Sequence, residues 1–381
     1  MKYIKGFFKG LIGLILIAVI ALYLTDYEYI LKGVRVVYLT GHTTAYIDDY
    51  PKFENAVIEK AAAQPWPQHK KYNTVTPTAK LSSVNSALGT VAYVIMKNDS
   101  IWYEDYAEDY GPRSQTNSFS MAKSITSAML GKAIKDGFIK GLDQPIGDFF
   151  PQYASAKTTV GDLSSMASGL DWEEHYTSPF SVTARAYYDD DLAETILNQK
   201  VTETPGQGFK YLSGNTQLLG MVIQEATKKK LATYLSETFW KPMGMEQDAL
   251  WQLDDGQHQL AKTYCCIASN ARDFARFGKL YKDFGKWNGK QLLDSAFVAK
   301  SIRPRFKNDS EYGYGFWLSN HKNKEIFVMR GILGQYVITI PEDDLIIVRL
   351  GHARGSFLDG KPFTSDFYEY IDAAYEMLEM E

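Results

Sequence analysis

Cysteine is scarce in this chain of 381 residues, which holds only Cys265 and Cys266, side by side. No histidine or cysteine stands at metal-ligand spacing from this pair, which argues against a metal site there. Adjacent cysteines can close only a strained bridge, and free thiols are common in protein cores. We therefore expect both side chains to pack in the core, and the sequence leaves their redox state open.

An excess of positive charge is also missing. Lys and Arg total 41 against 45 Asp and Glu, and the formal net charge is −4. A nucleic-acid partner would call for a strong basic excess, so we expect none. The sequence contains no H-E-x-x-H, P-loop or G-x-G-x-x-G motif. It also lacks the Gly-x-Ser-x-Gly elbow of Ser-His-Asp hydrolases.

The one long hydrophobic run lies at the N-terminus. Lys2, Lys5 and Lys9 precede an uncharged run from Gly10 to Thr25. Positive charge ahead of an apolar run sends the downstream chain across a membrane. A cleaved signal peptide is the alternative, but the segment offers no small-residue cleavage site. We therefore predict that residues 1–25 are a membrane anchor or signal segment, with the remainder outside the cytoplasm, in a bacterial periplasm or at the cell surface.

Strand-like patterns lie near both ends of the rest of the chain, and helical patterns fill its middle. Residues 90–106 predict a β-hairpin, and residues 325–352 predict three strands. We expect an α+β fold in which these strands form one antiparallel sheet flanked by helices, with a mostly helical insertion. Residues 26–80 are predicted to be an irregular lead-in, and residues 81–381 one domain. The closing segment predicts an amphipathic helix with Tyr368, Ile371, Tyr375 and Leu378 on its apolar face.

Ser120 and Lys123 stand three residues apart at the start of a predicted helix. Side chains at that spacing share a helix face, and a lysine of lowered pKa can take the proton of a serine nucleophile. An oxyanion formed at Ser120 would lie near the positive end of the helix dipole. Spacing alone leaves a capped surface helix as the simpler interpretation.

Two further segments carry side chains of interest. Tyr211 and Ser213 lie in a turn before a helix, and a tyrosine near a lysine can transfer protons. Gly331 and Gly334 interrupt a strand near the C-terminus, where glycine permits close approach of a ligand or another backbone. Each segment also has an ordinary explanation, a packing tyrosine and a β-bulge.

Together, in this order, these segments resemble the serine β-lactamase and penicillin-binding-protein superfamily. The chain is most similar to the class C-related branch of esterases, D-aminopeptidases and 6-aminohexanoate-oligomer hydrolases. The similarity covers about residues 80–381 and is also seen in "TTVGDLSSMASGLDW" and "YGYGFWL".

The resemblance implies a serine hydrolase that cleaves an amide or ester bond of a small molecule or peptide, with no metal and no cofactor. It implies that Ser120 is the nucleophile and that Lys123 and Tyr211 transfer protons. It also implies an oxyanion hole formed by the backbone N–H groups of Ser120 and Ile332.

The chain departs from the family pattern at two points. The Tyr-x-Asn element has Ser213 in place of asparagine, and the Lys-Thr-Gly element is Met329-Arg330-Gly331. Adjacent strand residues face opposite sides, so we expect Arg330 to point away from the usual place of the cation. Both changes favour amide or ester substrates over β-lactams. Candidate substrate-binding residues are Ser213, Gly331, Trp172 and Tyr176, the last two from a loop that also carries Glu173 and His175.

Two other functions remain open from the sequence. A penicillin-binding receptor or D,D-peptidase-like protein would become acylated with little turnover. A catalytically inactive scaffold would share the fold. The sequence does not determine the physiological substrate or the oligomeric state.

Overall fold

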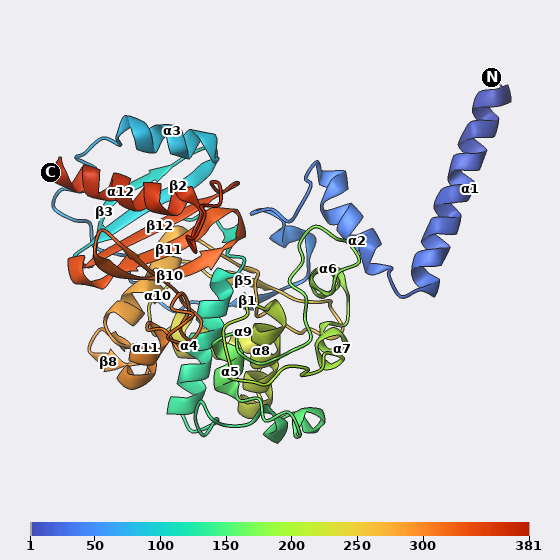
Figure 1. The fold of residues 1–381 in the computed structure, drawn as a ribbon. Helices are drawn as coiled ribbons and strands as arrows, with labels where there is room; N and C mark the ends of the chain where they lie inside the picture. The colour runs from blue at the N-terminus through green and yellow to red at the C-terminus, as the bar shows by residue number, and fades with distance from the viewer. Residues whose placement is uncertain (1, 381) are drawn as a thin grey trace.

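A six-stranded antiparallel sheet with helices on both faces forms one side of the computed structural model, which describes residues 2–380 (Figure 1). The strand order is β3-β2-β12-β11-β10-β9, so the early hairpin pairs with the last strand of the chain, as in Val94↔Val348. This sheet confirms the predicted α+β fold. Its strands are β2 (Thr90–Lys97), β3 (Ser100–Tyr106), β9 (Trp317–His321), β10 (Lys324–Gly331), β11 (Gln335–Ile340) and β12 (Leu345–Gly351).

Successive residues of these strands face two different cores. Val94 and Val348 belong to the larger core, whereas Tyr93 and Ile347 belong to the smaller one. This follows from the period of two in a β-strand, and it explains why the central strands are apolar throughout. Helices α4 (Met121–Lys135) and α10 (Ala271–Lys282) cover one face, and α3 (Ala79–Ala87) and α12 (Ser365–Glu379) cover the other.

The C-terminal helix α12 does not bury the predicted face. Of the four residues expected there, only Ile371 is fully buried, and the others lie at the edge of the smaller core. Apolar and aromatic residues cover more than half of the circumference of this helix, and the four predicted residues lie along one edge of that arc. The Tyr375 hydroxyl donates to Asp343 at this edge. The buried residues are Asp366, Phe367, Tyr370, Ile371, Ala373, Ala374 and Met377.

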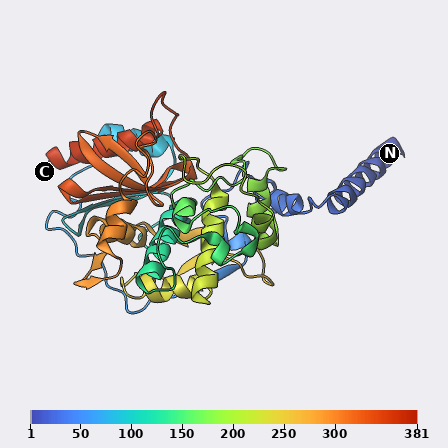
Figure 2. The same cartoon turned by 60° about the horizontal axis from the view of Figure 1, so that its bottom comes forward.

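The helices from the middle of the chain form a separate layer beside the sheet (Figure 2). Helices α4 and α8 (Ser213–Thr227) pack against each other within it. Because α4 also touches β10 and β11, it lies at the seam between the two parts. The other helices are α5 (Val160–Ser164), α6 (Val182–Tyr188), α7 (Leu192–Leu197), α9 (Leu231–Leu235), the π-helical turn Ser236–Trp240 and α11 (Ser295–Ser301).

Residues 26–80, expected to be irregular, contribute ordered elements to the fold. Strand β1 (Asn55–Ile58) pairs with β5 (Ala249–Gln252) in a second sheet of order β1-β5-β6-β4. Helix α2 (Tyr29–Val36) packs against α6. The sequence pattern missed β1 because a short strand whose partner is so distant in the chain has little local signal. The remaining strands are β4 (Thr116–Asn117), β6 (Ile267–Ser269), β7 (Lys286–Trp287) and β8 (Lys290–Gln291).

Helix α1 (Lys2–Leu24) projects away from the rest of the chain (Figures 1 and 2). Within residues 2–380 it is the one helix long and apolar enough to cross a membrane. The most apolar 18-residue stretch within Tyr3–Leu24 has a mean hydropathy of 2.5, and none of it is buried. A signal sequence has the same length and composition, so the helix alone does not distinguish an anchor from a cleaved leader.

We expect Gly278→Ala in α10 to destabilise the fold. The added Cβ would lie 2.7 Å from Thr339 Oγ1 and 3.1 Å from Val337 Cγ1, so the helix would have to move off the sheet. Overpacking of this kind costs about 1–3 kcal/mol, which outweighs the higher helix propensity of alanine. Guanidinium unfolding would measure the loss. Gly111→Ala is the control, because nothing lies within 4 Å of its added Cβ. Equal stabilities would contradict close packing of α10 on the sheet.

Candidate active site

Ser120 stands at the start of α4, directly after a sharp turn that follows β4. Phe119 in this turn has a φ of 45°, which is uncommon for a residue other than glycine. Ser118 fastens the turn to β6, because its N–H donates to the Ile267 carbonyl at 2.8 Å and its Oγ accepts from Ile267 N at 3.1 Å. The turn presents Ser120 at the helix N-terminus, where backbone N–H groups and the helix dipole favour negative charge.

Lys123 is the centre of a buried polar cluster. The residue is only 2% exposed. Its Nζ donates to Ser120 Oγ at 2.9 Å, to the Tyr264 carbonyl at 2.9 Å and to Ser213 Oγ at 3.1 Å. An ammonium has three N–H donors, so these acceptors match it fully. Lys123 therefore joins Ser120 to two segments that are distant in the chain.

Tyr211 lies just before α8 and faces the same ammonium. The Lys123 Nζ is 4.9 Å from the centroid of the Tyr211 ring. The ring packs 5.1 Å from that of Trp317 in β9, which holds it at the seam between the helical layer and the sheet. The structure thus brings Ser120, Lys123 and Tyr211 together at one place.

Glu174 is a member of this cluster that the sequence did not indicate. Its Oε1 accepts from Ser213 Oγ at 2.7 Å and from the Tyr176 hydroxyl at 2.5 Å. Its Oε2 accepts from Ser213 N at 2.6 Å and from Trp172 Nε1 at 2.9 Å. All four contacts are donors to the carboxylate. Glu174 is thereby connected to Ser120 through Ser213 and Lys123, a path that no local motif reveals.

The predicted loop residues have different positions in the site. Trp172 is buried against Gly214 and supports Glu174. Tyr176 is 52% exposed and lines the opening beside Ser120. Asn215 is buried and hydrogen-bonds with Met166 and Ser168, whereas Ser213 accepts a hydrogen bond from Lys123.

The end of β10 passes close to the turn that carries Ser120. A Cβ added to Gly331 would lie 2.4 Å from the Ser118 carbonyl oxygen, so only glycine permits this approach. Ile332 follows it and lines the cavities beside Ser120. This is the arrangement expected if the Ile332 N–H faces the serine.

Arg330 reaches the site although its neighbour Met329 is buried in the larger core. Arg330 faces the smaller core, on the other side of the sheet, so the strand alternation holds. Its guanidinium lies over Trp317 and Phe363, 4.9 Å and 5.0 Å from their ring centroids. Arg330 therefore faces the opposite side of the strand from Met329, as expected, and it also lines a cavity together with Ser120.

Two cavities meet at Ser120. The charged cavity, of about 250 Å³, is lined by Glu174, Tyr211, Arg330 and Arg354. The aromatic cavity is lined by Phe119, Tyr187, Tyr188 and Tyr264. Ser120, Tyr176 and Ile332 border both. A substrate held across Ser120 would therefore place one part in each cavity.

The sequence profile of the family described as Beta-lactamase matches residues 57–362 of this chain. The chain belongs to the β-lactamase family. It is accordingly a serine hydrolase of the β-lactamase and penicillin-binding-protein fold, whose members act through an acyl-enzyme, and the predicted family and enzyme class are confirmed.

Individual relatives agree with this assignment. The 6-aminohexanoate-dimer hydrolase of Paenarthrobacter ureafaciens is 23% identical over 288 residues, which cover 68% of this chain and 72% of that protein. A Bacillus anthracis structure provisionally assigned as a 6-aminohexanoate-dimer hydrolase aligns with a TM-score of 0.71 and 19% identity, covering 87% of this chain and 92% of the other. The D-amino acid amidase of Ochrobactrum anthropi aligns with a TM-score of 0.59 and 16% identity, covering 78% and 96%.

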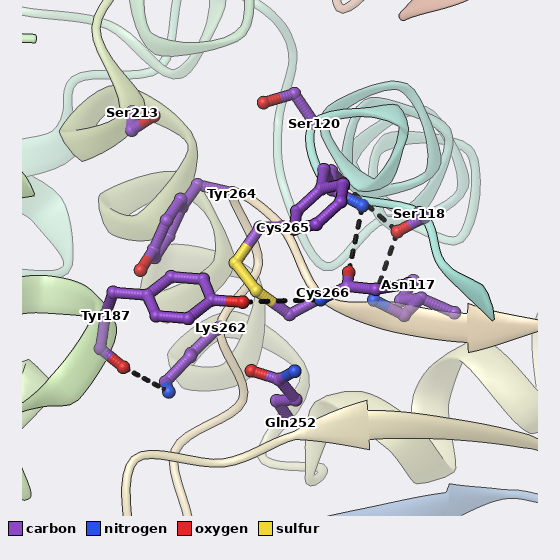
Figure 3. Close-up of a disulfide and its surroundings, with 12 residues drawn as sticks. Asn117, Ser118, Ser120, Tyr187, Ser213, Gln252, Lys262, Tyr264, Cys265 and Cys266 are labelled. Atoms are coloured by element: carbon purple, nitrogen blue, oxygen red, sulfur yellow. Dashed lines mark hydrogen bonds between the residues drawn. A yellow bond between two sulfur atoms is a disulfide. The ribbon is translucent and has the colours of Figure 1, made fainter. Parts of the chain in front are cut away.

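The two cysteines of this β-lactamase-family chain are joined in a disulfide between adjacent residues (Figure 3). Both residues are buried, as expected, and the disulfide is the redox state that the sequence left open. Cys266 has a φ of 79°, a backbone conformation that sequence spacing does not reveal. Cys265 lines the aromatic cavity, and the carbonyl of the preceding Tyr264 holds Lys123.

A buried charged pair lies behind the aromatic cavity. Asp49 accepts from Tyr187, Asn117 and Gln252, and Lys262 Nζ donates to the Tyr187 carbonyl at 2.6 Å. Burial raises the pKa of Asp49 to about 6. Burial, with a smaller effect of Lys32, lowers the pKa of Lys262 to about 7. Both groups hold Tyr187, which forms a wall of the cavity.

Asp254, Asp255 and His258 form a separate cluster whose possible ligand atoms lie within 4.8 Å of one another. The two aspartates line a cavity with Lys32 and Arg35, and this cavity does not include Ser120. Exposed acidic groups often cluster without a cation, so the geometry alone does not assign a metal there.

We expect Glu174→Gln to destabilise the protein more than Glu173→Gln. The glutamine amide would place an N–H₂ group against two hydrogen-bond donors, which costs about 1–3 kcal/mol when a buried group loses its partner. Glu173 is the matched control, because its side chain is exposed. Denaturant unfolding would compare the two variants with the native protein. Equal losses of stability in the two variants would contradict the view that the Glu174 carboxylate accepts four hydrogen bonds.

We expect the free energy of unfolding to depend on pH through Lys262. The unfolded lysine keeps its proton up to about pH 10.5, whereas the folded one loses it near pH 7, so the unfolded state binds more protons and stability rises with pH. Between pH 7 and 9 the native protein should gain about 1–3 kcal/mol relative to Lys262→Met. Lys80→Met, at an exposed position, is the control. Parallel profiles for the native protein and Lys262→Met would contradict the lowered pKa.

Proposed function

We propose that this chain hydrolyses an ester or amide bond through an acyl-enzyme on Ser120, with Lys123 and Tyr211 transferring protons. One observation carries the proposal. The Lys123 Nζ lies 2.9 Å from Ser120 Oγ, and it is buried while Ser120 borders two cavities. A nucleophile and its base must be within hydrogen-bond reach, and this pair meets that requirement.

In the first step, Ser120 Oγ forms a bond to the substrate carbonyl carbon, and its proton passes to Lys123 in the amine form. The carbonyl oxygen becomes an oxyanion. The N–H groups of Ser120 and Ile332 would donate to it, and one such donor contributes about 3–4 kcal/mol in well-studied hydrolases. The α4 dipole acts in the same direction.

In the second step, the bond from the carbonyl carbon to the alcohol or amine breaks, and the leaving group takes a proton from Tyr211. The tyrosine regains this proton from Lys123, whose ammonium lies over its ring. Water then attacks the acyl carbon and gives a proton to Lys123 or Tyr211, the bond from that carbon to Ser120 Oγ breaks, and the proton passes on to Ser120 Oγ. The products are a carboxylic acid and the alcohol or amine. Glu174 positions Ser213, which in turn positions Lys123.

The residues around the site favour a linear ester or amide over a β-lactam. Ser213 is shorter than the amide it replaces and is already engaged by Glu174 and Lys123. Arg330 borders the charged cavity from the far face of β10. Relatives with this fold include proteins named as amidase and carboxylesterase, which supports both bond types.

We further propose that α1 anchors the catalytic part outside the cytoplasm. Lys2, Lys5 and Lys9 lie at the N-terminal side of this exposed apolar helix, and positive charge stays on the cytoplasmic side of a span. Protease protection in intact cells would test the orientation. An epitope at Glu381 that resists protease added to spheroplasts would contradict it.

We expect Ser120→Ala and Lys123→Ala to abolish turnover of p-nitrophenyl butyrate, with losses of about a thousandfold or more. Tyr211→Phe removes one proton donor and should cost less, about a hundredfold. Initial rates and labelling by a fluorophosphonate probe would measure both effects. Ser83→Ala, on the exposed side of α3, is the control and should keep native rates.

Two outcomes would contradict hydrolysis. A single stoichiometric release of p-nitrophenol followed by no turnover would identify a receptor that stays acylated. Native protein that neither turns over the ester nor reacts with the probe would identify an inactive scaffold. Turnover that survives Ser120→Ala would place the nucleophile elsewhere.

A further inference from the structure

The aromatic cavity continues into a second cavity beneath α2. This α2 cavity, of about 410 Å³, is lined by Tyr29, Gly33, Val34, Val37 and Tyr38 from α2 and the turn after it, and by Tyr176, Thr177, Ser178, Pro179, Ala184 and Tyr188. Four residues line both spaces, Thr44, Tyr176, Ala184 and Tyr188. The two cavities therefore adjoin and lead from Ser120 to the surface of α2.

Among the described residues, no Asp, Glu, Lys or Arg lines the aromatic cavity or the α2 cavity, and His175 is the one basic side chain on this path. The charged cavity on the other side of Ser120 has Glu174, Arg330 and Arg354. The acidic and guanidinium side chains near Ser120 therefore lie on one side of it, and aromatic, aliphatic and hydroxyl side chains line the path on the other side, which suits a molecule with one uncharged apolar end and one polar end.

The wall of this path is joined directly to the base of α1. Asp26 pairs with Arg185 of α6 at 2.9 Å, the Tyr27 ring packs 5.3 Å from that of Phe180, and the Tyr29 hydroxyl donates to the Pro179 carbonyl at 2.9 Å. Residues 25–28 alone separate α1 from α2, and such a link spans at most about 14 Å. If α1 lies in a bilayer, the α2 cavity opens beside the bilayer surface.

We propose that the aromatic and α2 cavities together bind the acyl chain of a membrane lipid ester, with its polar alcohol part in the charged cavity. The inference rests on the proposed hydrolase function and names its substrate class. An apolar chain gains free energy by leaving water for an uncharged groove, and a groove that opens at the membrane takes the chain without passing it through water. Ser120 then lies at the ester carbonyl, where the chain meets the polar part.

The first experiment uses the full chain in phosphatidylcholine nanodiscs with p-nitrophenyl dodecanoate and p-nitrophenyl acetate. The native protein should prefer the long ester. Val34→Asp places a charge in the α2 cavity and should lower the ratio of dodecanoate to acetate kcat/KM by about tenfold or more. Val57→Asp is the matched control, because Val57 is 52% exposed on β1 and lines neither cavity. An unchanged ratio in Val34→Asp would contradict acyl-chain binding in these two cavities without contradicting the proposed hydrolase function.

The second experiment does not depend on turnover. Ser120→Ala protein in the same nanodiscs is irradiated with methyl dodecanoate carrying a diazirine, and the adducts are located by mass spectrometry. Adducts within residues 29–38 and 176–188, in addition to α1, support the groove. Adducts confined to α1 overturn it. If the native protein cleaves neither ester, the proposed hydrolase function fails, and this labelling alone decides whether the groove binds an acyl chain.

Discussion

The buried ammonium of Lys123 is the interaction on which the rest of the site depends. It takes one acceptor from its own helix, Ser120, and two from elsewhere, Ser213 and the Tyr264 carbonyl. A charged group at this depth is stable only when its donors are satisfied. The segments that carry Ser120, Ser213 and Tyr264 must therefore be packed together in the folded protein. The same contacts place the Lys123 Nζ 2.9 Å from Ser120 Oγ, the hydroxyl that the proposed mechanism has Lys123 deprotonate after it has lost its own proton.

The surroundings of Lys123 are arranged in successive layers. Glu174 holds Ser213 through two hydrogen bonds and is itself held by Trp172 and Tyr176. On the opposite side, the Cys265–Cys266 disulfide directly follows the Tyr264 carbonyl. These outer contacts restrict the movement of Ser213 and of the Tyr264 carbonyl, which in turn hold Lys123. Preorganisation of this kind lets a site stabilise developing charge without rearranging.

Local chemistry predicted much of this molecule. The hairpin around Asn98 and Asp99, the strands of residues 325–352 and the helix after Ser120 all have short-range signals, either periodicity or turn residues. The family resemblance then predicted that Ser120, Lys123 and Tyr211 belong to one site, and the structure places them close together. Strand β1 and the buried face of α12 were missed, and the disulfide was left open. Each of these depends on a distant partner or on a backbone conformation that residue spacing does not encode.

The sequence by itself determined the α+β class, the family, the apolar N-terminal helix and the pair Ser120 and Lys123, because helix periodicity and short motifs are properties of neighbouring residues. Only the tertiary structure decided the carboxylate at Glu174, the two cavities on either side of Ser120 and the connection of the aromatic cavity to α2. These features arise where segments far apart in the chain meet. Their positions follow from packing of the whole fold, and no stretch of sequence contains them.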